Sequence, residues 1–197
     1  MISKILFIIN VLVIIQIKTS SCNYSQRTCL IRSFKYSNEY LYASNNIFTG
    51  EILQIQNPSH NIYTIPLESV DIFGKLKWII QKSNQTFTIK SNKDEYLCSS
   101  NLHHDVFRKR RRIYLKGNNK NNYKVSQKCK WRLEQINDLS FIVWNDYFNE
   151  PLYSPSFFYK YNSIKRYVYL WKNKVKSSSE FRWFIDCDSI SSFMLIN

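Results

Sequence analysis

The chain contains an internal threefold repeat, and no other feature of the sequence restricts its fold as strongly. A Glu-x-Leu motif recurs 56 and 55 residues apart, and a Trp-centred motif recurs 53 and 52 residues apart. The first stands at residues 39–42, 95–98 and 150–153, and the second at residues 77–80, 130–133 and 182–185. Self-similarity at nearly one period indicates three copies of one supersecondary unit.

Two further motifs follow the same period. Basic-aromatic segments stand at residues 111–115 and 166–170, and Phe-centred segments stand at 86–90 and 140–144, with 28–34 as a weaker first copy. All the motifs are short, aromatic and β-branched, and clusters of Asn, Ser, Asp and Lys separate them. This pattern is typical of β-strands joined by turns.

Twelve short strands in three sets of four predict an all-β chain with the β-trefoil fold, a six-strand barrel capped by a triangle of hairpins. Closure removes the exposed edges that so many strands would otherwise present. The alternative is another antiparallel β barrel or sandwich. Residues 62–65 fit the first copy only by their distance to Trp78, which predicts an insertion there. We also expect the Trp strand at 182–185 to complete the first copy, with the two terminal strands side by side.

The first 22 residues have the order of a secretory signal peptide. Lys4 precedes an apolar run at residues 5–15, and the small polar residues 19–21 follow. The run is shorter than the ~20 apolar residues of a membrane span. We therefore expect a secreted, extracellular protein with no transmembrane segment. The expected organisation is a signal peptide at 1–22, a single β-trefoil domain at 23–187 and a C-terminal tail at 188–197.

The cysteine count fits secretion. Cleavage after Cys22 leaves four cysteines, which allow three disulfide connectivities, whereas cleavage before it leaves one unpaired thiol. Adjacent terminal strands would bring Cys29 beside Cys187, and Cys98 would then pair with Cys129. Glycosylation sequons begin at Asn23 and Asn84.

Over residues 27–187, four motifs follow one another: Lys-Trp-x-Ile/Leu, Phe-x-Ile, Glu-Tyr-Leu-Tyr and Arg-Arg-x-Tyr-Leu. This succession resembles that of secreted β-trefoil proteins of insects, including salivary ones. It is more distantly similar to ricin-type trefoils. The resemblance implies the fold and secretion. The Gln-x-Trp of ricin-type sugar sites is absent, because Leu76, Cys129 and Phe181 stand two residues before the three tryptophans.

The positive charge is concentrated in one segment. The chain has a net charge of +14, and residues 106–133 hold eleven basic residues and no acidic residue. Strand alternation directs about half of the side chains at 110–115 inward, and we expect the arginines to face solvent. Tyr114 and Tyr123 would lie between them as stacking surfaces. The candidate anion-binding residues are Arg108, Lys109, Arg110, Arg111, Arg112, Lys116, Lys120 and Lys124.

Such a segment predicts a secreted, non-enzymatic and monomeric binding protein with an anionic glycan, for example a sulfated one, or an extracellular protein as partner. Arginine suits sulfate and carboxylate because its guanidinium binds them in a bidentate manner. The leader makes cytosolic nucleic acid a poor candidate. A solvated face without function is the simplest alternative. A second alternative is a protease inhibitor that presents Arg108–Arg112 or Lys172–Lys176 in an exposed loop.

The sequence offers little for catalysis. Three glycines are too few for the Gly-rich loops that cradle nucleotides. The cysteines and histidines lack the spacing of a zinc site. The run His103-His104-Asp105 is more typical of a solvated turn than of a metal or acid-base cluster. We therefore predict no enzyme activity, no catalytic residue, no metal and no cofactor.

Overall fold

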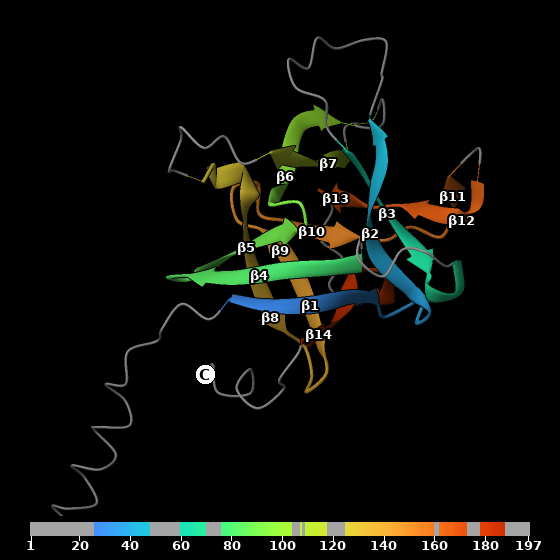
Figure 1. The fold of residues 1–197 in the computed structure, drawn as a ribbon, viewed down its shortest axis with the longest axis horizontal. Coiled ribbons are helices and arrows are strands. Elements are labelled where there is room, and N and C mark those ends of the chain that lie inside the picture. Colours follow the sequence, from blue (N-terminus) through green and yellow to red (C-terminus); the bar gives the residue numbers. More distant parts are fainter. Residues whose placement is uncertain are drawn as a thin grey trace, which may run out of the picture.

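The described part of the chain consists of β-strands and three short 3-10 turns (Figure 1). The structure is a computed structural model, and it describes residues 26–47, 60–69, 76–103, 107, 109–117, 125–159, 162–172 and 178–187. The predicted signal peptide, Asn23 and the predicted tail at 188–197 lie outside these residues. Within them, no helix is long and apolar enough to cross a membrane.

Six strands form a closed antiparallel barrel. They pair in the order β1–β4–β5–β8–β9–β14, and β14 pairs back on β1 with Cys29 opposite Cys187. These strands are β1 (Gln26–Ser33), β4 (Lys77–Ser83), β5 (Thr86–Ser91), β8 (Lys130–Gln135), β9 (Ser140–Asn145) and β14 (Arg182–Cys187). The two terminal strands therefore lie side by side, as the repeat predicts.

The remaining eight strands form three hairpin units that cap one end of the barrel, namely β2–β3, β6–β7 and β10–β13, and the third unit also contains the β11–β12 pair. β7 pairs with both β3 and β13, and β3 also pairs with β12, so strands from all three copies meet in a triangle. The cap strands are β2 (Glu39–Ile47), β3 (His60–Pro66), β6 (Glu95–His103), β7 (Arg110–Gly117), β10 (Glu150–Tyr153), β11 (Phe158–Tyr159), β12 (Asn162–Tyr167) and β13 (Tyr169–Trp171). The 3-10 turns are η1 (Leu67–Ser69), η2 (Gln127–Cys129) and η3 (Ser179–Phe181). The fold is a β-trefoil, which confirms the predicted class.

One buried tryptophan per copy joins the barrel to the cap. The indole N–H of Trp78 donates to the carbonyl of Leu41 at 2.9 Å. Trp131 donates to Leu97 at 2.9 Å, and Trp183 donates to Leu152 at 3.2 Å. Each acceptor is the Leu of the Glu-x-Leu motif.

These bonds correct the expected assignment of strands to copies. Each copy begins with a Phe-type strand and ends with its own Trp strand, because each Trp bonds to the hairpin that precedes it in the chain. The strand at 182–185 therefore completes the third copy and not the first. It still neighbours β1, because the barrel is closed.

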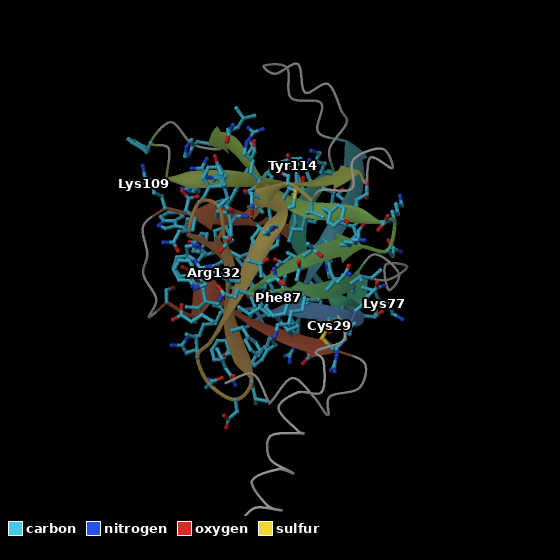
Figure 2. All side chains as sticks on the ribbon, turned by 90° about the vertical axis from the view of Figure 1, so that its left-hand side faces the viewer. Cys29, Lys77, Phe87, Lys109, Tyr114 and Arg132 are labelled. Carbon is cyan, nitrogen blue, oxygen red and sulfur yellow. A yellow bond between two sulfur atoms is a disulfide. The ribbon has the colours of Figure 1, made fainter. Side chains whose placement is uncertain are left out.

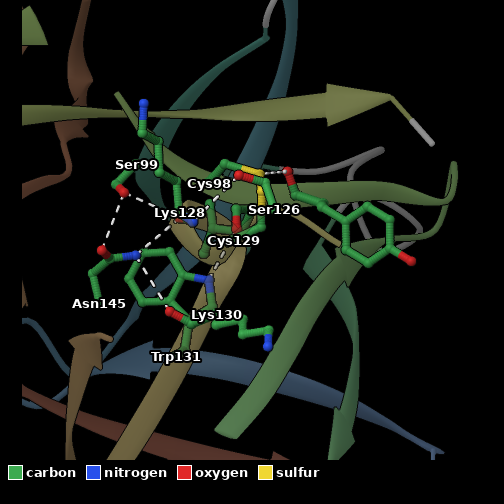
Figure 3. Close-up of a disulfide and its surroundings, with 10 residues drawn as sticks. Cys98, Ser99, Ser126, Lys128, Cys129, Lys130, Trp131 and Asn145 are labelled. Carbon is green, nitrogen blue, oxygen red and sulfur yellow. Dashed lines mark hydrogen bonds between the residues drawn. A yellow bond between two sulfur atoms is a disulfide. The ribbon is translucent and has the colours of Figure 1, made fainter. Parts of the chain in front are cut away.

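Two disulfides tie the structure together. Cys29–Cys187 joins the first and last barrel strands, and Cys98–Cys129 joins β6 to η2, as the predicted pairing requires. Beside the second disulfide, the side-chain amide of Asn145 donates to the carbonyl of Lys128 at 3.0 Å, and the Ser99 hydroxyl contacts the same carbonyl at 3.0 Å (Figure 3). This buried polar network fixes the short chain segment that leads into β8.

The Trp131→Phe variant tests the indole-to-carbonyl bond. The substitution leaves the Leu97 carbonyl without its donor and opens a void, so we expect a loss of about 2–4 kcal/mol in the free energy of unfolding. Urea denaturation provides the measurement. Trp171→Phe is the matched control, because Trp171 is only half-buried, and it should cost less than about 1 kcal/mol. Equal losses in the two variants would contradict this role of the bond.

Candidate basic surface

Strand β7 carries the centre of the predicted anion site, and its side chains alternate strictly between two environments. Arg111, Ile113 and Leu115 are buried, whereas Arg110, Arg112 and Tyr114 are half-buried and Lys116 is exposed. The alternation follows from the period of two along a strand. One face of β7 therefore belongs to the core, and the other presents a row of basic and aromatic side chains.

The prediction that the arginines of β7 face solvent is wrong for Arg111. Its side chain is buried in a bidentate ion pair with Glu150, with Nε–Oε2 2.8 Å and Nη2–Oε1 3.1 Å. The guanidinium also lies 3.6 Å from the ring centroid of Phe148. Strand alternation places residue 111 on the same face as Ile113, and Glu150 of the next copy supplies the compensating charge. Arg111 is a structural residue.

The same arrangement occurs in the third copy. The Nε atom of Arg166 lies 2.7 Å from Oε1 of Glu39, and the Thr64 hydroxyl donates to the other oxygen of this carboxylate at 2.6 Å. The Arg166 guanidinium lies 3.9 Å from the ring centroid of Tyr36. In both cases the Glu of one copy's motif binds the Arg of the preceding copy around the barrel. The Arg–Glu ion pair therefore occurs twice and connects neighbouring hairpins each time.

On the outer face of β7, aromatic rings hold Arg110 in place. Its guanidinium lies 4.8 Å from the ring centroid of Phe157 and 5.4 Å from that of Trp171. Trp171 lies directly opposite Arg110 in the β7–β13 ladder. Cation–π contacts of this kind restrict the side chain without neutralising its charge.

Arg112 lines a small pit at the centre of the cap. Asn61, Arg112 and Tyr167 occupy equivalent positions of the three copies, one residue before the buried Ile62, Ile113 and Val168. All six residues line a cavity of about 40 Å³. The three copies thus present different side chains, an amide, a guanidinium and a phenol, around one axis.

Burial perturbs the tyrosines beside this row. It raises the pKa of Tyr153 to about 12, and the neighbouring Glu180 carboxylate acts in the same direction. Burial also raises the pKa of Tyr169, which faces Arg112 in the ladder, while the charges of Arg110 and Arg112 act against the shift. Both phenols are therefore neutral at physiological pH.

The other predicted residues divide into two groups. Lys109, just before β7, and Lys116, near its end, are both exposed. Figure 2 shows Lys109 and Tyr114 along β7 with Arg132 on β8 below them, all on one side of the molecule. The Arg132 Nε lies 2.7 Å from Oδ1 of Asp146, so this charge is compensated. Arg108, Lys120, Lys124 and Tyr123 lie outside the described residues.

The remaining candidates lead to no catalytic centre. Among the described residues, no three His, Cys, Asp or Glu side chains come together as a metal site. His103 ends β6 opposite Arg111, while His104 and Asp105 lie outside the described range. Asn84 is exposed at the turn between β4 and β5 with φ 55°, and its glycosylation stays a prediction.

Comparisons of sequence and of structure give different results. No protein-family model matches the chain, and no curated protein sequence matches it. A solved salivary protein from Culex, described as a member of the Cysteine and Tryptophan-Rich family, is similar in structure with a TM-score of 0.59 at 15% identity. That match covers 85% of this chain and 98% of the other.

Two further structures share the architecture. The designed threefold symmetric protein ThreeFoil matches with a TM-score of 0.58 at 9% identity, over 81% of this chain and 97% of the design. A ricin B-like lectin from Macrolepiota procera, solved in complex with lactose, matches with a TM-score of 0.53 at 16% identity. That match covers 81% of this chain and 94% of the lectin. At these identities the similarity establishes the β-trefoil fold and nothing finer.

The Arg111→Met variant tests the buried ion pair. Removing one partner leaves the Glu150 carboxylate buried and uncompensated, and we expect a loss of about 3–5 kcal/mol in the free energy of unfolding. Arg112→Met, one residue further along the strand, should cost about 1 kcal/mol or less. Replacing Glu150 as well, in Arg111→Met/Glu150→Leu, should recover part of the loss. Equal midpoints of denaturation for Arg111→Met and Arg112→Met would refute a structural role for Arg111.

The raised tyrosine pKa predicts a loss of stability in alkali. A phenol with a higher pKa in the folded than in the unfolded chain keeps its proton longer when folded, so stability falls as pH rises from about 10 to about 12. Urea midpoints measured across this range should decline. The decline should be shallower in Tyr153→Phe, which has no phenol to ionise at this position. Identical pH profiles would show that Tyr153 does not contribute.

Proposed function

We propose that this protein is a secreted, non-enzymatic binding protein that holds an anionic extracellular glycan against the outer face of β7. The binding residues are Lys109, Arg110, Arg112 and Lys116, and Arg108, Lys120 and Lys124 extend the same segment in the sequence. Arg111 is not among the ligand contacts, because its guanidinium is paired with the Glu150 carboxylate. We expect the protein to act as a monomer.

The row of alternate residues on β7 is the observation that carries the proposal. Successive outward side chains of a strand are about 6.6 Å apart, so 110, 112, 114 and 116 form a line of polar groups along an extended ligand. The row holds two arginines and one lysine, with Tyr114 between them. Arginine binds sulfate and carboxylate with two parallel hydrogen bonds, and tyrosine offers a flat surface to a sugar ring.

The secretory features support an extracellular glycan over nucleic acid. The leader predicted at residues 1–22 and the two disulfides both fit an oxidising compartment. The similar Culex structure is described as a salivary protein, and the similar Macrolepiota structure is a lectin that contains lactose. The fold can therefore present a sugar-binding surface, although the present chain lacks the Gln-x-Trp motif.

The alternative of a basic inhibitory loop has less support. Arg110, Arg111 and Arg112 lie within β7, where they pair with Trp171, Leu170 and Tyr169 of β13. A strand that is paired inside a sheet cannot enter a protease cleft as an extended loop. The second loop candidate, Lys172–Lys176, is described only at Lys172, and it stays a prediction.

Heparin-affinity chromatography with two charge-matched variants tests the proposal. The wild type should elute above physiological salt, and Lys109→Glu/Lys116→Glu should bind about tenfold more weakly. The control is Lys77→Glu/Lys93→Glu, which changes the net charge equally at two exposed lysines outside β7. The control should elute close to the wild type. The proposal would be wrong if the wild type eluted at or below physiological salt, or if both variants lowered the salt concentration of elution equally.

A further inference from the structure

In the pit at the centre of the cap, side chains from all three copies converge. The pit lies where β3, β7, β12 and β13 meet, and Figure 1 shows these strands close together. Asn61 of β3, Arg112 of β7 and Tyr167 of β12 line it, and all three are half-buried, so part of each side chain is accessible. The buried residues that follow each of them in the chain complete the lining. A ligand can therefore reach the three polar side chains from the outer side of the cap.

The size of the pit restricts what can enter it. Its volume is about 40 Å³. Sites for whole small molecules have roughly 300–1,000 Å³, whereas the pit has room for about three water molecules. A sugar ring is therefore too large for the pit, but a single oxyanion group of a larger ligand fits.

The polar side chains of the pit can all donate hydrogen bonds. The Asn61 amide and the Tyr167 phenol supply neutral donors, and the Arg112 guanidinium supplies charged ones. None of the described residues that line the pit is acidic. This set of donors favours an anion over a cation.

Aromatic packing holds one wall of the pit in place. The ring centroid of Tyr167 lies 5.3 Å from that of Tyr63 and 5.5 Å from that of Tyr169. Tyr169 in turn lies opposite Arg112 in the β7–β13 ladder. A donor whose position is fixed before the ligand arrives loses little side-chain entropy on binding.

Further cations lie on the same face of the cap. Arg110 stands two residues before Arg112 on β7, so both side chains face the same side of the strand. Lys165 stands in the same relation to Tyr167 on β12, and it too is half-buried. Lys165 lies outside the basic segment at 106–133, so the fold brings its charge to this surface. Cations gathered around a depression raise the local concentration of anions.

We propose that the pit binds one sulfate ester group of the glycan that lies along β7. A sulfate ester presents three terminal oxygens in a threefold arrangement, and the three copies place one donor side chain each around the axis of the cap. A carboxylate is planar and has two oxygens, so it leaves one of the three donors without an acceptor. The proposal rests on the proposed function for the glycan that carries the sulfate. It adds Asn61 and Tyr167 as residues that select sulfate over carboxylate.

NMR titration with glucose 6-sulfate and methyl glucuronide tests the proposal, because both ligands carry one negative charge on a single sugar ring. The protein is produced in an oxidising bacterial compartment, so that both disulfides form. Glucose 6-sulfate should shift the Arg112 Nε–H and Asn61 side-chain amide signals, and it should bind about tenfold more tightly than the glucuronide. Unchanged signals at millimolar glucose 6-sulfate, or equal affinity for the two ligands, would overturn the proposal.

Two pairs of matched variants locate the binding. Tyr167→Phe removes one hydroxyl from the pit, and Tyr153→Phe removes one from a half-buried tyrosine outside it. Arg112→Met removes one charge from the pit, and Lys116→Met removes one from the exposed end of the β7 row.

The first variant of each pair should bind glucose 6-sulfate about tenfold more weakly, because it loses a hydrogen bond to a charged group. The second variant of each pair should bind within about twofold of the wild type. Equal losses within either pair would contradict the assignment of the sulfate to the pit.

Heparin retention separates this proposal from the proposed function. Tyr167→Phe keeps every charge of the β7 row, so it should be retained on heparin nearly as strongly as the wild type. Binding of glucose 6-sulfate in the pit without heparin retention of the wild type would support the pit while refuting the role of the row. Heparin retention without binding in the pit would refute the pit and leave the role of the row standing.

Discussion

The hydrogen bond from a buried indole to a leucine carbonyl determines most of this structure. It occurs once in each copy, from Trp78, Trp131 and Trp183, and each time it joins a barrel strand to the cap hairpin of the same copy. A buried indole N–H without an acceptor would cost about 1–3 kcal/mol, so the hairpin must present its carbonyl at one height above the barrel. Around the central axis, β7 pairs with β3 and β13, and β3 pairs with β12.

Some equivalent positions carry the same side chain in more than one copy, whereas others differ from copy to copy. The ion pairs Arg111–Glu150 and Arg166–Glu39 repeat, as the indole bonds do, and they fasten one hairpin to the next. The first copy has His60 at the position equivalent to these arginines, and the Ser91 hydroxyl donates to the Glu95 carboxylate at 3.3 Å. By contrast, Arg112 occurs in one copy alone, where the other two copies have Asn61 and Tyr167. Residues that break an internal symmetry without a structural need are the best candidates for function, because the scaffold has already been built without them.

The repeats were sufficient to predict the fold class, the adjacent terminal strands and both disulfide pairings, because all of these depend on the order of strands in a closed barrel. They were insufficient to predict the environment of Arg111. Alternation with Ile113 and Leu115 places residue 111 on the inward face, but a buried arginine there requires a compensating charge. That charge belongs to Glu150, which stands 39 residues away and reaches Arg111 only through the register between copies.

Net charge is a poor guide to where such a protein would attract an anion. An arginine that is buried against a carboxylate has a field that largely cancels outside the protein, and this applies to Arg111 and, at the surface, to Arg132 with Asp146. Arg110 has different surroundings, because the rings of Phe157 and Trp171 lie beside its guanidinium, and an aromatic ring restrains a cation without itself carrying an opposite charge. A guanidinium that packs against aromatic rings therefore keeps its attraction for a distant anion, and the rings fix its position. The basic segment is consequently two populations of residues with different surroundings, one paired with carboxylates and one packed against aromatic rings.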